Sequence, residues 1–234
     1  GSEMCIRDRL YISLNSLRDM RITKKNMIES QLKPEGITCL DTIDCISKIN
    51  REDFVPEKYA DSSYAEFDIP LGNNYFMLRP ITVAKILQLL EIKKSDDILE
   101  IGTGTGYLTC CLSILGKSVD TLDIDNGIQA KAKSSINNYN LYNISFINED
   151  VFSNWIPKKK YDVIVLTGST DSRVEKLEDS LNQDGRMFVV TGNYPVMDVN
   201  IIKRVSEKKL IIDQAFETTL DPLKNIYKKS CLNF

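Results

Sequence analysis

The chain has 234 residues, of which 42% are hydrophobic and 27% charged, and it carries a formal net charge of -3. This length suits one domain with a modest extension, and the balanced charge provides no basic field that would favour nucleic acid as a partner. The complete absence of histidine excludes histidine bases, and the cysteines lack metal-ligand spacing, so we expect reduced, packed thiols and no metal site.

Residues 1–19 show no hydrophobic periodicity, and Gly1-Ser2 is typical of a tag-cleavage scar. We therefore expect 1–19 to be a foreign or disordered leader, with Met20 as the natural start. The sequence shows neither a signal-peptide pattern nor an apolar run of membrane-spanning length, which predicts a cytoplasmic protein without a membrane partner.

Two helices are predicted ahead of the first strand. The first covers Arg21–Leu32 and is ended by Pro34-Glu35-Gly36, and the second carries isoleucines at helical spacing, namely Ile43, Ile46 and Ile49. A turn-rich connector then leads to a helix over 80–91, where Pro80 occupies the first turn and its missing N–H costs little. We assign 20–79 to an N-terminal helical extension that ends in a substrate loop.

From this helix onward, strand and helix patterns alternate. Strands are predicted at Ile98, Ser118–Asp123, Ile144–Asn148, Tyr161–Leu166 and Arg186–Val190, with helices at Tyr107–Cys111, Gln129–Asn138 and Arg173–Leu181, and with a hairpin formed by Ile201–Ser206 and Lys209–Thr218. Such alternation predicts an α/β fold with helices on both faces of a mostly parallel seven-stranded sheet and an antiparallel C-terminal edge. We assign 80–234 to this domain.

The stretch Asp97–Thr109, DILEIGTGTGYLT, places three glycines directly after a buried strand. Gly102, Gly104 and Gly106 let a ligand approach bare backbone at the start of a helix, although their spacing is neither the dinucleotide fingerprint nor a phosphate loop. Glu100 would repel a bare pyrophosphate, so a ligand with a cationic centre fits better.

A second acidic residue follows at the distance expected for a ribose-binding acid, roughly 20 residues after the first glycine. Asp123 ends the next predicted strand, where its carboxylate can accept both ribose hydroxyls. Glu100, the glycines and Asp123 together predict S-adenosylmethionine bound to a Rossmann-like class I methyltransferase domain, with S-adenosylhomocysteine as the product. The alternative is an ordinary β-turn-α unit of another α/β protein.

The ends of later strands supply further candidates, because strand ends in a parallel sheet face the ligand crevice. Asp150 can accept a hydrogen bond from the adenine amino group, with a role as a turn or helix cap as the alternative. Thr167 and Ser169 follow the fourth strand, where an acceptor would meet the methyl group.

With these residues in place, the chain from about Met20 onward resembles the protein-L-isoaspartate O-methyltransferase family. The words that carry the resemblance are MIESQL, INREDFVPEKYADSSYAEFDIPLG, DILEIGTGTGYLT, YDVIVLTGS and GRMFVV. The resemblance implies the fold and the cofactor, and it implies cofactor-binding roles for Glu100, Gly102, Gly104, Gly106, Asp123 and Asp150. We expect Thr103, Tyr107, Ile124, Val151 and Thr167 to complete the cofactor-binding set. The chain ends sooner after the hairpin than full-length members of the family do.

The substrate motif departs from the family pattern P-I-G-x-G-Q-T-I-S-x-P, because here the segment Pro70–Pro80 reads PLGNNYFMLRP. The Gln, Thr and Ser positions become Tyr75, Phe76 and Leu78, which indicates a divergent branch with a more apolar acceptor pocket. Burying an acceptor carboxylate against Phe76 and Leu78 would cost several kcal/mol unless Arg79 clamps it. No residue is assigned as a catalytic base, and the candidates for the acceptor side are Tyr75, Arg79, Thr167, Ser169, Asn73 and Asn74.

Three functions remain open for this methyltransferase-like chain. The first is methylation of isoaspartyl or other carboxyl groups of a protein or peptide. The second is methylation of a small molecule such as a thiol or sulfide, which suits the apolar loop. The third is a non-catalytic module that binds S-adenosylmethionine and regulates a partner. We expect a monomer or a weak dimer.

Overall fold

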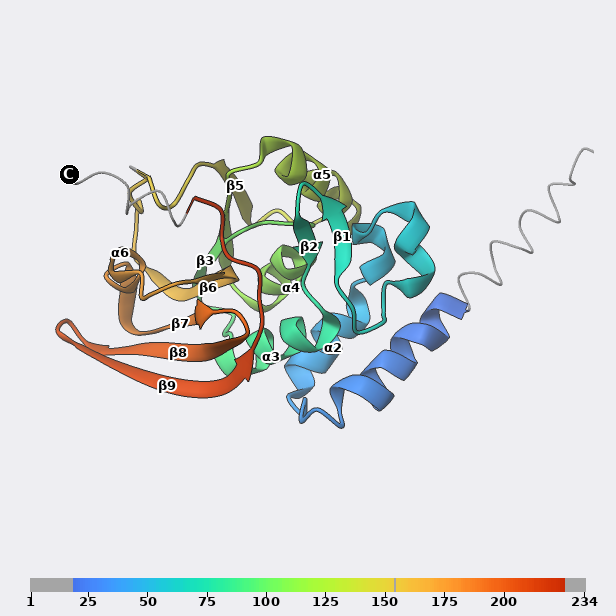
Figure 1. Ribbon diagram of the computed structural model, residues 1–234, viewed down its shortest axis with the longest axis horizontal. Coiled ribbons are helices and arrows are strands. Elements are labelled where there is room, and N and C mark those ends of the chain that lie inside the picture. The colour runs from blue at the N-terminus through green and yellow to red at the C-terminus, as the bar shows by residue number, and fades with distance from the viewer. Residues whose placement is uncertain (1–18, 154, 226–234) are drawn as a thin grey trace, which may run out of the picture.

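The computed structural model describes residues 19–153 and 155–225, and its centre is a seven-stranded sheet in the order β5-β4-β3-β6-β7-β8-β9 (Figure 1). Strands β3 to β7 are parallel, whereas β8 and β9 add antiparallel pairs at one edge. The strand bounds are β3 Asp97–Ile101, β4 Ser118–Asp123, β5 Ile144–Asn148, β6 Tyr161–Thr170, β7 Leu181–Asn193, β8 Val196–Ser206 and β9 Lys209–Thr218. The predicted α/β fold, with its antiparallel C-terminal hairpin, is confirmed.

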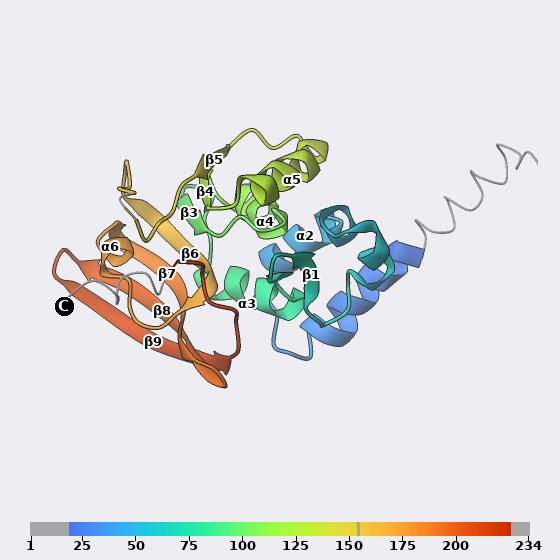
Figure 2. The ribbon, with the colours of Figure 1, turned by 45° about the horizontal axis from the view of Figure 1, so that its top comes forward.

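Helices precede and connect these strands. Residues 19–27 are helical and continue into η1 (Ile28–Leu32), which confirms the first predicted helix. The other helices are α2 Leu40–Lys48, η2 Arg51–Phe54, η3 Glu57–Ser62, α3 Pro80–Leu90, α4 Tyr107–Leu115, α5 Asn126–Ile136, η4 Asn137–Tyr139 and α6 Glu175–Glu178. The N-terminal helices gather at the end of the molecule opposite the β8–β9 hairpin in both views (Figures 1 and 2).

Alternate residues of the central strands enter two separate cores. Ile98 and Val163 pack with helices α3, α4 and α5 on one face of the sheet, whereas Leu99 and Ile164 pack with α6 and Trp155 on the other. A strand that is buried on both faces reads as a continuous apolar run, which is why these segments were predictable from the sequence. The sheet is therefore covered on both faces, as predicted.

The helix predicted at Arg173–Leu181 is wrong in extent, because α6 has only 4 residues. Leu177 and Leu181 are both buried, but Leu181 already belongs to β7. The backbone N–H of Tyr161 donates to the carbonyl of Ser180 at 2.8 Å, so the chain joins the sheet directly after α6. The apolar spacing that suggested one helix thus comes from two elements.

A small hairpin, β1 (Ile69–Gly72) with β2 (Tyr75–Met77), was not predicted. Asn73 and Asn74 form its turn with φ values of 50° and 57°. Two consecutive left-handed residues are the signature of a type I′ turn, and asparagine is one of the residues that tolerate it. The predicted substrate loop is therefore an ordered hairpin that leads into α3.

The predicted leader lies outside the described residues except for Asp19, and so does the end of the chain after Asn225. The division into an extension at 20–79 and a domain at 80–234 stays a prediction.

Candidate functional site

The glycine loop after β3 is held by the end of the neighbouring strand. The N–H groups of Gly102 and Thr103 donate to the carbonyl of Leu122 at 2.7 and 3.2 Å, and the N–H of Gly104 donates to Oδ2 of Asp123 at 3.1 Å. Gly102 and Gly104 have φ values of +96° and +51°, which favour glycine. At these two glycines the loop therefore presents bare backbone along the carboxyl end of the sheet.

A large cleft of about 680 Å³ opens along this edge. Its walls include many of the predicted cofactor residues, namely Gly102, Gly104, Asp123, Ile124, Asp150, Val151 and Thr167. Asp123 is only 7% exposed, and its second oxygen accepts the N–H of Asp125 at 2.9 Å. Burial raises the pKa of this carboxyl group, while the two backbone N–H groups favour its charged form.

Other predicted cofactor residues lie behind the loop. Glu100, Thr103 and Tyr107 line a second, smaller cavity, and Gly106 lines neither cavity. A Cβ at Gly106 would approach Ile136 to 2.9 Å, so this glycine permits close packing of α4 against α5. Gly106 thus shapes the site through packing, with no surface facing the cleft.

Glu100 is completely buried, and its Oε2 accepts hydrogen bonds from Thr109 at 2.6 Å and Thr121 at 2.7 Å. Its Oε1 has no partner among the described residues. Desolvation raises the pKa of Glu100 to about 8, against the opposing effect of the two threonine hydroxyls.

Asp150 sits on the cleft wall, but both of its carboxylate oxygens have partners. Oδ1 accepts the N–H of Phe152 at 2.8 Å, and Oδ2 accepts the side-chain amide of Asn225 at 2.9 Å. The first contact is the turn cap that the sequence offered as the alternative role. An adenine amino group would share or replace the second contact.

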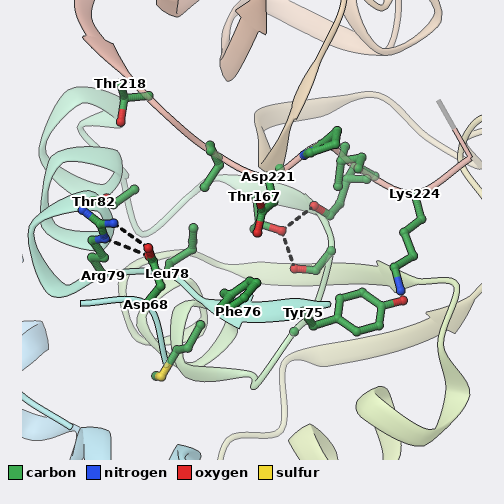
Figure 3. A pocket seen from close by; sticks show the side chains of 18 of the residues that line it. Asp68, Tyr75, Phe76, Leu78, Arg79, Thr82, Thr167, Thr218, Asp221 and Lys224 are labelled. Atoms are coloured by element: carbon green, nitrogen blue, oxygen red, sulfur yellow. Dashed lines mark hydrogen bonds and ion pairs between the residues drawn. The ribbon is translucent and has the colours of Figure 1, made fainter. Parts of the chain in front are cut away.

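The acceptor-side candidates are only partly brought together. Asn74, Tyr75, Arg79 and Thr167 line the cleft, and Thr167 Oγ1 donates to the carbonyls of Ile101 and Gly102 (Figure 3). Asn73 lies in the hairpin turn outside the lining, where its carbonyl accepts from Lys224.

Ser169 does not reach the cleft. It is 1% exposed, and its hydroxyl donates to the carbonyl of Leu220 at 2.7 Å. Its backbone forms a parallel bridge with Pro222. The structure therefore gives Ser169 a role in anchoring the C-terminal segment.

The sequence interpretation missed this C-terminal wall and the acidic partner of Arg79. Asp68 holds the Arg79 guanidinium through two hydrogen bonds, at 2.8 and 2.5 Å, and the guanidinium lowers the pKa of Asp68. Lys224 lies over the Tyr75 ring, 3.5 Å from its centroid, opposite Arg79 in the cleft (Figure 3). No local pattern marks these residues, although the proximity of Asp68 to the altered motif was a usable signal.

Two observations test whether S-adenosylmethionine fits. A Cβ at Gly104 would find no atom within 4 Å, so open space lies against the loop backbone beside Asp123. The buried Oε1 of Glu100, on a side chain that lines the smaller adjoining cavity, also lacks a partner among the described residues. The residues therefore fit a nucleoside with a cationic amino-acid end.

No helix in the described ranges is long and apolar enough to cross a membrane. Likewise, residues 19–153 and 155–225 contain no group of three or more cysteine, aspartate or glutamate side chains placed to hold a metal ion.

Comparison with known proteins gives a consistent result. A family model described as protein-L-isoaspartate(D-aspartate) O-methyltransferase matches residues 22–226. Protein-L-isoaspartate O-methyltransferase of Aliivibrio salmonicida is 32% identical over 173 residues, which cover 74% of this chain and 83% of the relative. The enzyme of the same name from Alteromonas mediterranea is 32% identical over 177 residues, which cover 74% and 84%.

Solved structures agree in fold. A Plasmodium falciparum protein, described as protein-L-isoaspartate O-methyltransferase in complex with S-adenosyl-L-homocysteine, superposes with a TM-score of 0.75 at 18% identity over 88% of this chain and 98% of its own. A second structure, described as protein-L-isoaspartate O-methyltransferase, has a TM-score of 0.73 at 21% identity over 87% of this chain and 66% of its own.

Proposed function

Because the chain belongs to the protein-L-isoaspartate O-methyltransferase family, we propose that it methylates a side-chain carboxylate of a peptide, with isoaspartyl residues as the acceptor class. Membership makes the chain an S-adenosylmethionine-dependent methyltransferase. The observation that carries the proposal is the cleft of about 680 Å³, in which Gly104 and Asp123 share one space with the β1–β2 hairpin and Arg79. Its volume falls in the range of roughly 300–1,000 Å³ common for ligand sites.

One set of residues would bind the cofactor, and another set would bind the methyl acceptor. Backbone at Gly102 and Gly104 would cradle the cofactor, Asp123 would accept its ribose hydroxyls, and Ile124 and Val151 would contact its base. S-adenosylmethionine, when bound, supplies a methyl group on a positively charged sulfur. A carboxylate acceptor needs no proton removed, which agrees with a chain that has no histidine and no assigned base.

Positioning is then the main contribution of the protein, and well-aligned reactants can gain ~7–11 kcal/mol from it. Arg79 would orient the acceptor carboxylate. Its pair with Asp68 uses Nε and Nη2 and so leaves Nη1 for another acceptor. Lys224, on the opposite wall, adds a second cation close to Tyr75.

One observation favours a second candidate, methylation of a small apolar thiol or sulfide. Phe76 is 46% exposed and lines the cleft, together with Leu71, Leu78, Leu220 and Leu223. These side chains offer no hydrogen bond to a carboxylate. They would pack well against an apolar acceptor.

Binding and transfer assays separate the candidates. Calorimetry with S-adenosylmethionine and S-adenosylhomocysteine tests the donor site, and absence of binding would refute every candidate. Methyl transfer is then measured on an isoaspartyl peptide, on the same peptide with ordinary aspartate, and on a panel of small thiols. Transfer confined to thiols would refute the carboxyl proposal, and inertness towards all acceptors would favour a non-catalytic module.

A matched pair of variants tests the acceptor side. Arg79→Gln should raise KM for the isoaspartyl peptide at least tenfold without changing the affinity for S-adenosylhomocysteine. Asp68→Asn, which removes the partner and keeps the cation, should raise KM less. Equal effects of both substitutions would show that the ion pair matters only for the shape of the hairpin.

A further inference from the structure

Arg51 is a completely buried cation without an acidic partner among the described residues. Its Nε donates to the carbonyl of Ser63 at 2.7 Å, its Nη2 donates to the carbonyl of Leu78, and its guanidinium carbon lies 5.1 Å from the centroid of the Tyr107 ring. Nη1 has no partner among the described residues. An unpaired buried donor on a charged group is costly, so a ligand for it is expected.

Glu100 has a buried hydrogen-bond acceptor without a partner, which complements the unpartnered donor of Arg51. Both side chains line one cavity of about 50 Å³, where Nη1 of Arg51 and Oε1 of Glu100 are the buried polar atoms without partners. Arg51 is the only cation among the described residues around this cavity. The space is larger than one water needs, which is roughly 10–15 Å³ of comparable volume.

The small cavity adjoins the large cleft. Gly102, Gly104, Phe76, Leu78 and Thr167 line both of them, so the glycine loop and the hairpin border both spaces. A molecule seated on the loop backbone can therefore extend one end towards Arg51 and Glu100. Phe76 and Leu78, which wall the cavity from the hairpin, carry no hydroxyl for an anion.

We propose that Nη1 of Arg51 donates a hydrogen bond to the carboxylate of the methionyl end of S-adenosylmethionine, while Oε1 of Glu100 accepts a hydrogen bond from the ammonium group. The proposal rests on the proposed function for the identity of the cofactor. A free amino acid end carries one anion and one cation, and the cavity offers one unpaired donor on a cation and one unpaired acceptor on an acid. The ammonium and the carboxylate of the ligand are both charged, and a hydrogen bond in which one partner is ionised is about twice as strong as a neutral one.

A purely structural role explains only part of the geometry. The contacts to Ser63 and Leu78 tie η2 to the connector and to the end of β2, which accounts for Nε and Nη2. Those contacts fix the guanidinium plane and leave Nη1, on a side chain that lines the cavity, without a partner among the described residues. Nε and Nη2 thus hold the Arg51 side chain in place, and Nη1 is left to bind the ligand.

Calorimetry with three ligands tests the proposal without any methyl acceptor. S-adenosylmethionine has both charged groups, its decarboxylated form keeps only the ammonium, and 5′-methylthioadenosine has neither. The wild-type protein should bind the decarboxylated form at least tenfold more weakly than S-adenosylmethionine. Arg51→Lys should weaken S-adenosylmethionine at least tenfold and leave the other two ligands within twofold of wild type.

Glu100→Gln should weaken S-adenosylmethionine and its decarboxylated form alike, and spare 5′-methylthioadenosine. Arg186→Lys is the matched control, because Arg186 is a largely buried arginine that pairs with Asp96 at 2.7 Å away from both cavities. It should leave the three affinities unchanged.

Equal binding of S-adenosylmethionine and its decarboxylated form by the wild type would overturn the proposal. A uniform loss of all three ligands in Arg51→Lys would indicate misfolding, and the wild-type series together with Glu100→Gln then decides. Failure of the wild type to bind any of the three would instead overturn the cofactor assignment itself, which distinguishes the two failures.

Discussion

Gly102 is the position where a single methyl group should disturb the site most. Its φ of +96° is a left-handed conformation, and an added Cβ would lie 2.1 Å from Oγ1 of Thr167. Alanine in such a conformation costs ~1–2 kcal/mol, and displacing the Thr167 hydroxyl from the carbonyls of Ile101 and Gly102 costs ~0.5–1.5 kcal/mol more. Gly102→Ala should therefore lower the free energy of unfolding by ~1.5–3.5 kcal/mol.

Urea denaturation with two controls separates these contributions. Gly36 has a φ of +84° and no atom within 4 Å of its Cβ position, so Gly36→Ala should show the backbone cost alone. In a Thr167→Ala background, the excess cost of Gly102→Ala over Gly36→Ala should disappear, because the hydroxyl that clashes is gone. Equal destabilisation by the two glycine substitutions, or an excess that persists without the hydroxyl, would refute the reasoning.

Three further substitutions test the donor site. Gly104→Ala meets no protein atom within 4 Å, so it should cost no more stability than Gly36→Ala yet weaken S-adenosylhomocysteine at least tenfold in calorimetry; unchanged affinity would place the ligand elsewhere. Asp123→Ala should weaken the same ligand by ~1.5–3 kcal/mol, and an unaltered Kd would show that Asp123 does not hold the ribose. Glu100 keeps its proton in the folded protein up to a pKa of about 8, above its ordinary value of 4.5, so its contribution to stability is present at low pH and is lost as the pH rises between these values. Glu100→Gln should flatten that decline in thermal melts from pH 4.5 to 8, whereas parallel curves for the two proteins would contradict the assignment.

The central sheet was predictable because its signals are local. Strands β4 and β5 begin and end where the sequence placed them, since each is a short segment with apolar residues, Val119 and Leu122 in β4 and Ile144, Phe146 and Ile147 in β5, next to polar ones. The glycines after β3 and the acid after β4 were equally readable, because backbone exposure and ribose recognition require particular residue types at particular spacings.

The acceptor side was less predictable, because pairing between distant segments leaves no local period. Ser169 follows the predicted strand and so looked accessible, but it lies inside the longer β6, and the C-terminal segment pairs with it and buries it. Arg79 was expected to bind an acceptor carboxylate, but in the structure it already donates to Asp68, which directly precedes the hairpin. The burial of Ser169 and the pairing of Arg79 both depend on which distant segments of the chain pack beside these residues.

Sequence alone thus determined the fold class, the cofactor class and the loop that carries it, since these follow from strand periodicity and from residues close in the chain. Tertiary structure alone decided which side chains face the donor and acceptor spaces. It placed Glu100 in the wall of the smaller cavity and not of the large cleft. It also brought Arg51, a connector residue that no sequence pattern had singled out, to that smaller cavity. The physical reason is that burial of a charge is set by all the elements packed around it, and no segment of the sequence records that sum.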